Sequence, residues 1–231
     1  MIHETVQPPP RARRREANLA RIVDAALALV AEGGLEALQM ARLADAVDYT
    51  PGALYRYVES KDALVALLVT GTLDQVQAEL RRAEAALPAR ATPLARIAAL
   101  VAAYRGFVQR EPHRFGLLAL SLAEPRVLVA DAAHAQATAG AVIGALTPLA
   151  GALAAAATAG ALAPGDATAR TLCLFTLVHG LSQLPKLARA APTRIDVDHL
   201  VTTGVRGLLV GWGGAPRAVD HALARTAEDA P

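Results

Sequence analysis

The apolar positions near the N-terminus recur at the spacing of a helix. They lie three or four residues apart, which is the i, i+3, i+4, i+7 pattern of an amphipathic helix. The glycine pair at 33–34 supplies a helix stop. The pattern predicts a helix over about residues 15–32, with an inner face formed by Leu19, Ile22, Val23, Ala26 and Val30.

Three further helices are expected before residue 88. The first is about two turns long, and a turn at residues 48–52 follows it. Thr50 is a good N-cap for the next helix, and Pro51 suits its first turn because the ring already fixes φ there. This helix is expected over residues 50–57. Ser60 then caps a helix that can run to Leu87, where Pro88 ends it.

Prolines divide the rest of the chain at helix-sized intervals, and each stands near the start of an apolar-periodic segment. No alternating apolar and polar run bounded by hairpin turns is present, so no sheet is expected. The fold class is therefore all-α, with residues 214–231 as a polar tail. The helices expected after residue 88 lie near 92–110, 112–122, 126–160, 166–188 and 194–212.

Composition supports this fold class and excludes some functions. Of the 231 residues, 54% are hydrophobic and only 3% aromatic, so alanine, leucine and valine dominate. The single cysteine, Cys173, excludes an internal disulfide or a multi-cysteine metal site and indicates a reducing compartment. The polar, basic N-terminus does not resemble a secretory signal. We expect a cytoplasmic protein with no metal and no cofactor.

One stretch allows a different interpretation. Between Asp131 and Asp166 the chain has no charged residue, which is long enough to span a bilayer. The stretch is rich in alanine, glycine and threonine rather than in the residues that favour insertion. A buried helix in a packed bundle is the preferred interpretation, and a membrane-associated helical protein is the alternative.

Basic residues are concentrated near the N-terminus, although the formal net charge of the whole chain is only +2. We expect residues 1–14 to form a flexible basic arm, for which a solvated tail without a partner is the alternative. The basic residues of this N-terminal region are Arg11, Arg13 and Arg14 in the arm and Arg15 and Arg21 after it.

Two short helices joined by a tight turn and preceded by a longer helix are typical of a helix-turn-helix. The second short helix and its turn carry Tyr49, Tyr55 and Tyr57, whose hydroxyls suit phosphate oxygens and base edges. Gly52 permits close approach to a duplex, and Lys61 adds a cation beside a helix N-terminus. The alternative is that the tyrosines cap a small core.

The segment ARIVDAALALVAEGGLEALQMARLADAVDYTPGALYRYVESKDALVALL resembles the DNA-binding domain of the TetR family of transcriptional regulators. Leu54-Tyr55 and Ser60-Lys61 match the family signature. The resemblance implies a three-helix domain over residues 15–62, phosphate contacts from Thr50, Tyr55, Tyr57 and Lys61, and base contacts near Arg42, Pro51 and Gly52. With these, we expect Arg13, Arg14, Arg15 and Arg56 to contact DNA.

Two departures from the family pattern affect this domain. Gln39 stands where the family has serine or threonine, so the second helix is more weakly capped. Asp48 stands where the family has glycine, and aspartate tolerates the left-handed conformation that the turn requires. Residues 1–62 contain eight basic and nine acidic side chains, a net charge of 8 − 9 = −1. DNA affinity must then come from individually placed contacts rather than from a broadly positive field.

Residues 63–213 resemble a ligand-binding domain of this family that is named for a Trp-His-Gly motif. AYRGFVQREPHRFGLL and LFTLVHGLSQL carry the match, and His179-Gly180 supplies two of the three named residues. The resemblance implies dimerisation and a pocket for a small effector. The candidates for that pocket, for which core packing is the alternative role, are Tyr104, Phe107, Phe115, Phe175 and His179.

An apolar stripe near the C-terminus predicts a dimer interface across a two-fold axis. Closure of the core within one chain is the alternative. The predicted interface residues are Leu174, Val178, Leu181, Val201, Gly204, Val205, Leu208 and Trp212.

An enzyme is the weakest interpretation. The six histidines are scattered, and Cys173 and His179 would lie on opposite sides of one helix, so no catalytic residue is named. The sequence thus predicts a homodimeric transcriptional regulator, most simply a repressor. It would bind a palindromic operator in double-stranded DNA, respond to a small, mainly apolar effector and have no membrane partner.

Overall fold

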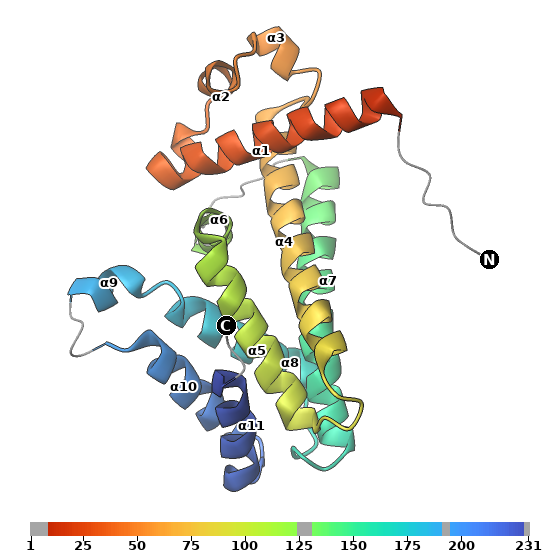
Figure 1. The fold of residues 1–231 in the computed structure, drawn as a ribbon, viewed down its shortest axis with the longest axis vertical. Helices are drawn as coiled ribbons and strands as arrows, with labels where there is room; N and C mark the ends of the chain where they lie inside the picture. Colours follow the sequence, from red (N-terminus) through yellow and green to blue (C-terminus); the bar gives the residue numbers. More distant parts are fainter. Residues whose placement is uncertain (1–8, 124–130, 191–194, 229–231) are drawn as a thin grey trace. The chain divides into compact units, whose positions relative to one another are not determined.

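The computed structural model describes residues 9–123, 131–190 and 195–228, and all regular structure in these ranges is helical (Figure 1). The all-α prediction is confirmed. The helices are α1 (Pro10–Ala37), α2 (Met40–Ala46), α3 (Pro51–Leu54), α4 (Lys61–Ala86), α5 (Pro93–Arg110), α6 (Pro112–Ala123), α7 (Ala132–Thr158), α8 (Ala167–Leu181), α9 (Pro185–Ala190), α10 (Val197–Gly211) and α11 (Pro216–Glu228).

The chain divides into two compact units. The N-terminal unit comprises Met1–Val69 and Gly116–Ala137, and the C-terminal unit comprises Thr70–Phe115 and Thr138–Pro231. This differs from the single boundary predicted at residue 62. The reason is that the first turns of α4, with the fully buried Leu64, belong to the N-terminal unit.

Three helices, α4, α6 and α7, therefore have residues in both units. Each carries a glycine close to the division: Gly71, Gly116 and Gly140. A Cβ atom built on any of these glycines would meet no neighbouring atom within 4 Å. Packing therefore does not require glycine at these positions, although glycine weakens a helix relative to alanine.

Helix α1 begins at Pro10 rather than near residue 15, so the prediction of a flexible arm is wrong for residues 10–14. Proline is favoured in a first helical turn because its missing N–H would have no partner there. The remainder of the predicted arm, residues 1–8, lies outside the described residues. The glycine stop is confirmed as a break, because Gly33 and Gly34 leave helical geometry before one last turn to Ala37.

The turn between α2 and α3 forms as the sequence predicts. Gln39 makes no side-chain cap to α2, and Asp48 adopts a positive φ of 58°. The Thr50 hydroxyl accepts a hydrogen bond from the Ala53 N–H at 3.2 Å. Helix α3 is shorter than expected, because the chain tightens after Leu54 into a turn in which the Tyr57 N–H donates to the Leu54 carbonyl at 2.9 Å.

In the C-terminal unit, α5 packs against α11, and α10 packs against α8 and α11. Its core contains Ile97, Leu100, Phe107 and Leu153, each at most 2% exposed. The helix expected over 166–188 is interrupted after Leu181 and resumes as α9.

The prediction of a polar tail after residue 213 is wrong. Residues 216–228 form α11, which buries Val219 and Ala222. An ion pair joins the Arg206 Nε atom on α10 to the Asp220 Oδ1 atom on α11 at 2.6 Å. Buried positions three residues apart indicate one helical face, which the high polarity of the segment obscures.

Helix α7 is the one described helix that is long and apolar enough to cross a membrane, and one third of its most apolar window is buried inside the protein. Length and composition alone are weak evidence for a span, because core helices of soluble proteins have the same properties. On the C-terminal part of α7, Ala152, Leu153 and Ala156 are buried, as expected for a helix of a packed bundle.

Candidate DNA interface and effector site

Helix α3 presents an exposed surface. Leu54 and Val58 are buried beneath it, whereas Pro51, Gly52 and Arg56 are exposed. Tyr55, also predicted to contact DNA, is 49% exposed, which is unusual for a large aromatic side chain. A Cβ atom added to Gly52 would point into open space, so the backbone here can approach a partner closely.

Tyr57 lies at the centre of a small cluster that ties α1 to the end of the helix-turn-helix. Its ring stacks on that of Tyr49, with the centroids 5.8 Å apart. Asn18 donates from Nδ2 to its hydroxyl at 2.9 Å, and this hydrogen bond lowers the pKa of Tyr57. The guanidinium of Arg15 lies 5.7 Å from the ring centroid. Tyr57 thus has a packing role, which is the alternative role expected for the tyrosines.

Two basic residues that were predicted to contact DNA are held by the C-terminal part of α1. Lys61 donates from Nζ to the carbonyl of Leu35 at 3.0 Å. Arg42 and Glu32 form an exposed ion pair, with Nη2 and Oε2 2.9 Å apart. A lysine ammonium has three donors, so Lys61 can keep this bond and still bind a phosphate. The predicted cap is also present, because the Ser60 hydroxyl accepts from the Ala63 N–H at 3.0 Å.

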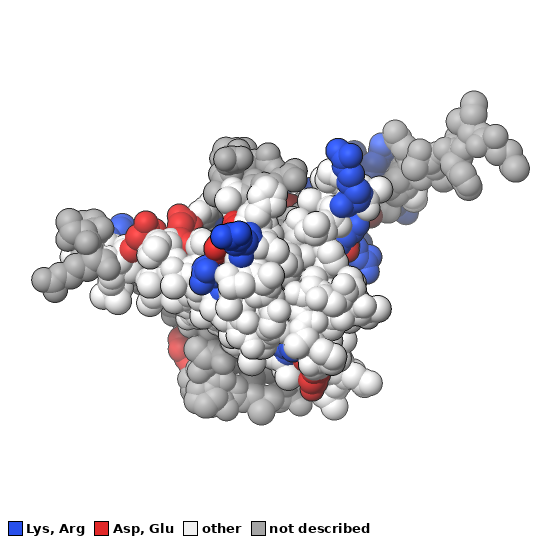
Figure 2. Space-filling model, turned by 90° about the horizontal axis from the view of Figure 1, so that it is seen from below, with Lys and Arg blue, Asp and Glu red and all other residues white. Residues whose placement is uncertain are grey.

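Arg13, Arg14 and Arg15 are exposed on the first turns of α1. On the face drawn in Figure 2, basic side chains form small groups among many uncharged residues.

In the C-terminal unit, four of the five predicted pocket residues form one cluster. The His179 ring centroid on α8 lies 5.1 Å from that of Phe115 on α6 and 5.3 Å from that of Phe175. Tyr104 on α5 lies 6.3 Å from His179 and makes an edge contact with Phe175. The fifth residue, Phe107, is buried one turn beyond Tyr104.

His179 is only 3% exposed. Its Nδ1 atom and the Tyr104 hydroxyl are hydrogen-bonded at 2.7 Å, whereas its Nε2 atom has no hydrogen-bond partner among the described residues. Burial lowers the pKa of His179 and raises that of Tyr104, because both charged forms lose hydration. The imidazole and the phenol are therefore both neutral near pH 7.

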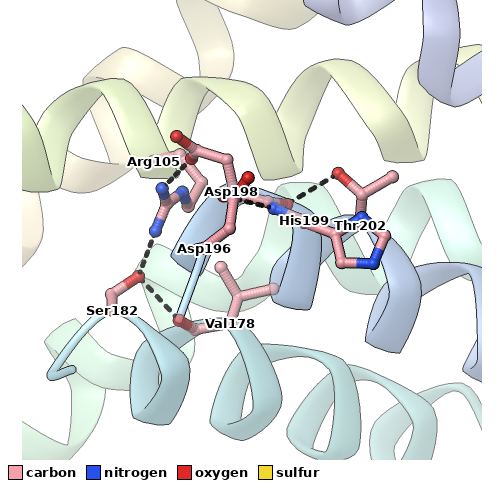
Figure 3. Close-up of polar contacts among 7 residues, drawn as sticks. All are labelled: Arg105, Val178, Ser182, Asp196, Asp198, His199 and Thr202. Atoms are coloured by element: carbon pink, nitrogen blue, oxygen red, sulfur yellow. Dashed lines mark hydrogen bonds and ion pairs between the residues drawn. The ribbon is translucent and has the colours of Figure 1, made fainter. Parts of the chain in front are cut away.

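A second polar cluster lies next to this one along the chain and joins three helices (Figure 3). Arg105 on α5 donates from Nη1 to the Ser182 hydroxyl at 3.3 Å and pairs with Asp198 on α10. The Arg105 side chain is 13% exposed and that of Asp198 77%. The Ser182 hydroxyl donates in turn to the carbonyl of Val178 at 2.7 Å. The sequence offered no signal for this cluster, because Arg105 and Asp198 are 93 positions apart.

The predicted dimer stripe lies largely inside one chain. Leu174, Val178, Val201 and Val205 are buried, so the prediction that they form a dimer interface is wrong. A Cβ atom on Gly204 would come within 2.9 Å of Leu177, which shows that α10 approaches α8 closely within the chain. The remaining members, Leu181, Leu208 and Trp212, are half-buried, and Arg170 covers the Trp212 ring at 5.4 Å.

The exposed faces of these two helices are rotated away from that stripe. On α8 the exposed face includes Leu172, Thr176 and Gly180, together with Cys173. On α10 it includes Leu200 and Gly207. Both faces are apolar or uncharged at these positions. Among the described residues, no three histidine, cysteine, aspartate or glutamate side chains group to hold a metal ion.

Two family models match the chain. Residues 22–68 match the model of bacterial regulatory proteins of the tetR family, and residues 97–208 match that of the tetracyclin repressor-like C-terminal domain. The chain belongs to the TetR family. Members of this family are transcriptional regulators rather than enzymes, and they are soluble proteins that bind DNA operators and small effectors and act as dimers.

Curated TetR-family relatives match a shorter region. The HTH-type transcriptional repressor KstR of Mycobacterium tuberculosis is 36% identical over 92 residues, which are 40% of this chain and 40% of that repressor. The KstR of Mycolicibacterium smegmatis is 36% identical over 92 residues, or 44% of its length. The alignments thus span less than half of these relatives.

Solved structures of TetR regulators share the whole fold. The regulator FadR from Bacillus subtilis, crystallised in complex with stearoyl-CoA, is 18% identical with a TM-score of 0.68 and covers 83% of this chain and 98% of its own. A TetR-family regulator from Rhodococcus RHA1 is 22% identical with a TM-score of 0.68 and covers 86% and 98%. At these identities the likeness concerns the fold alone.

Proposed function

We propose that the protein is a cytoplasmic transcriptional repressor that leaves its operator when a small, mainly apolar effector binds to the C-terminal unit. The observation that carries this proposal is the exposed surface of α3, with Tyr55, Arg56 and Gly52 displayed above a buried Leu54. This is the surface that a helix-turn-helix places in the major groove.

The contacts to DNA follow from the exposed groups. The exposed Thr50, Tyr55 and Lys61 bind phosphates. The half-buried Tyr57 accepts from Asn18 and still has its hydroxyl hydrogen to donate to a phosphate. Arg42, Pro51 and Gly52 lie nearest the bases. Arg42 leaves Glu32 to do so, which is inexpensive because an exposed ion pair contributes little to stability. The arginines at the start of α1 contact the adjacent backbone. A repressor of this type loses affinity steeply as salt rises.

A palindromic operator requires a two-fold dimer whose recognition helices match half-sites about 34–36 Å apart. We assign the dimer interface to the exposed faces of α8 and α10. Leu172 and Leu200 supply apolar area there, and Gly180 and Gly207 are open to close helix packing, since a Cβ atom on either would meet nothing within 4 Å. Leu208 and Leu181 lie at the margin of this surface.

The effector binds against the aromatic rings around His179. Support comes from the apolar character of the cluster and, by analogy, from the B. subtilis FadR structure with its apolar acyl ligand. Phe115 is the last residue of the C-terminal unit on α6, and Gly116 is the first residue of α6 that belongs to the N-terminal unit. A shift of Phe115 on effector binding is therefore passed directly along a continuous helix.

Release from DNA needs a ligand that distinguishes two states of the protein. Moving from 99% DNA-competent to 1% requires about 5.5 kcal/mol of differential binding. A ligand with equal affinity for both states would leave the operator occupied however tightly it bound.

The decisive test is a protection assay on the DNA that flanks the protein's own coding region, followed by retardation of the protected fragment. We expect a palindromic footprint. Lys61→Ala should weaken binding equally on all sequences and reduce the salt slope by about 1, because one phosphate contact is lost. Arg81→Ala, an exposed cation further along α4, is the matched control. If no fragment is protected, or if the two variants behave alike, the assignment of this surface to DNA is wrong.

A further inference from the structure

The Nε2 atom of His179 is a buried polar atom to which the described chain offers no partner. The side chain is 3% exposed, and the other ring nitrogen is already used by Tyr104 at 2.7 Å. Buried polar atoms in folded proteins are almost always hydrogen-bonded. The missing partner of Nε2 must therefore come from outside the described residues.

Counting hydrogens fixes what kind of partner is needed. If the Tyr104 hydroxyl donates to Nδ1, the imidazole hydrogen resides on Nε2 and one group, this N–H, remains unpaired. If Nδ1–H donates instead, both the hydroxyl hydrogen and the Nε2 lone pair remain unpaired. The first arrangement leaves fewer buried groups unsatisfied, so Nε2 is a donor and its partner is an acceptor.

The surroundings decide the charge of that acceptor. Phe115 and Phe175 flank the imidazole with ring centroids 5.1 and 5.3 Å away, which gives an apolar wall. Two arginines stand beside the cluster in the sequence, and both already have an anionic partner. Arg105, next to Tyr104, is paired with Asp198 and bonded to Ser182, and Arg114, next to Phe115, is paired with Glu111. A carboxylate at Nε2 would lose hydration without gaining a counter-charge, whereas a neutral carbonyl oxygen would lose little.

We propose that His179 donates a hydrogen bond from Nε2 to a neutral carbonyl oxygen of an otherwise apolar effector. Ketones, esters, amides and thioesters present such an oxygen. The inference rests on the proposed function only in naming the bound molecule as the effector. The tautomer of His179 and the preference for a carbonyl follow from the geometry alone.

The first test measures the tautomer. In protein labelled with ¹⁵N-histidine, the His179 signals are assigned by their loss in His179→Phe. We expect a neutral ring with hydrogen on Nε2. In Tyr104→Phe the hydroxyl donor is gone, and we expect a mixture of both tautomers. A ring with hydrogen on Nδ1 in the unmodified protein, or a charged ring at pH 7, overturns the proposal.

The second test uses three small probes of similar size: acetophenone, ethylbenzene and benzoate. We expect acetophenone to bind about tenfold more tightly than ethylbenzene, as one hydrogen bond implies, and to shift the Nε2 signal. Benzoate should bind most weakly. In His179→Phe, acetophenone and ethylbenzene should bind within about twofold of each other, whereas His221→Phe, at an exposed histidine on α11, should keep the preference.

Equal binding of acetophenone and ethylbenzene, tighter binding of benzoate, or an Nε2 signal that no probe shifts overturns the proposal; in the last case water pairs with Nε2. Operator retardation is measured separately. If the carbonyl preference depends on His179 but no compound that binds there alters DNA affinity, the site stands and the regulatory function fails. If the operator is bound and released but no compound shifts the Nε2 signal, the proposed function stands and this inference fails.

Discussion

The candidate DNA interface in the N-terminal unit and the cluster around His179 in the C-terminal unit hold their polar side chains in different ways. In the N-terminal unit the hydrogen-bonded pairs are exposed or half-buried and close in sequence: Arg42 and Glu32 are 10 positions apart, Lys61 and Leu35 are 26 apart, and Asn18 and Tyr57 are 39 apart. In the C-terminal unit, Tyr104 pairs with His179 across 75 positions, and the contact is buried. A surface that binds DNA keeps its polar groups exchangeable, whereas a buried site holds them in fixed pairs.

The largest effect should separate the core of the C-terminal unit from its exposed faces. Val205→Glu places an uncompensated charge at a fully buried position, and we expect a loss of about 4–5 kcal/mol or more in the free energy of unfolding. Leu172→Glu lies on the exposed face of α8 and should leave the helical circular dichroism unchanged while light scattering shows monomers. A folded dimer of Leu172→Glu would place the interface on another surface.

A matched pair of tyrosine variants tests the comparison directly. Tyr104→Phe leaves Nδ1 of a buried histidine without its partner and should lower the free energy of unfolding by about 1–3 kcal/mol. Tyr55→Phe removes an exposed hydroxyl, so the free energy of unfolding should change by less than about 0.5 kcal/mol. The free energy of operator binding should weaken by about 1 kcal/mol, because one hydrogen bond is lost. Denaturant titration of both variants measures their stability, and DNA retardation measures their operator affinity. If both variants were destabilised equally, the Tyr104 hydroxyl would be no more important to stability than the exposed Tyr55 hydroxyl, and the contrast between the two sites would be wrong.

The pH dependence of stability should report on His179. Burial holds its pKa in the folded protein below the ordinary value of 6.5, so the unfolded chain binds more protons just below that pH. The free energy of unfolding should therefore fall as the pH decreases through this range, and His179→Phe should remove that part of the slope. Thermal melts between pH 7.5 and 5.5 measure it. An unchanged slope in His179→Phe would show that the imidazole is not held neutral by the fold.

The smallest effect concerns the three glycines near the division between the units. Gly71→Ala, Gly116→Ala and Gly140→Ala add a methyl group where nothing lies within 4 Å, and each should raise the free energy of unfolding by about 0.5–1 kcal/mol. If these helices carry the response to the effector, the triple variant should also release DNA less readily at equal ligand occupancy. If the triple variant is more stable but releases DNA as readily as the unmodified protein, the three glycines have no role in the response to the effector.

How well each region can be predicted from the sequence depends on how far apart in the sequence its interacting residues are. The Thr50 cap, the turn at Asp48 and the break at Gly33–Gly34 depend on neighbouring residues, and the sequence predicted all three. The same holds for the start of α4, where Ser60 provides the cap. The all-α class follows because the apolar spacing itself is local.

The errors concern which face of a helix meets which partner. Val201 and Val205 form an apolar stripe whether they face a second chain or α8 of their own, and periodicity does not distinguish the two. The sequence predicts a tail where α11 lies, because the charged residues of this segment outweigh its narrow apolar face. Four of the pocket candidates that the sequence names do lie together, because the family resemblance directs attention to the few aromatic residues of this unit. The Arg105–Ser182–Asp198 cluster depends on three helices meeting, which no local pattern records.

The N-terminal unit draws on two stretches of chain, residues 1–69 and 116–137, and this bears on how such regulators can diversify. A single recombination at residue 62 or 69 would separate the helix-turn-helix from the segment of α6 and α7 that belongs with it. Exchange of the whole effector unit requires three junctions, one in each of α4, α6 and α7. Recombinants with all three junctions should keep both cores intact, whereas those with one junction should expose apolar surface and aggregate. If the proposed site around His179 binds the effector, new specificities are reached more readily by point changes there than by the exchange of whole units.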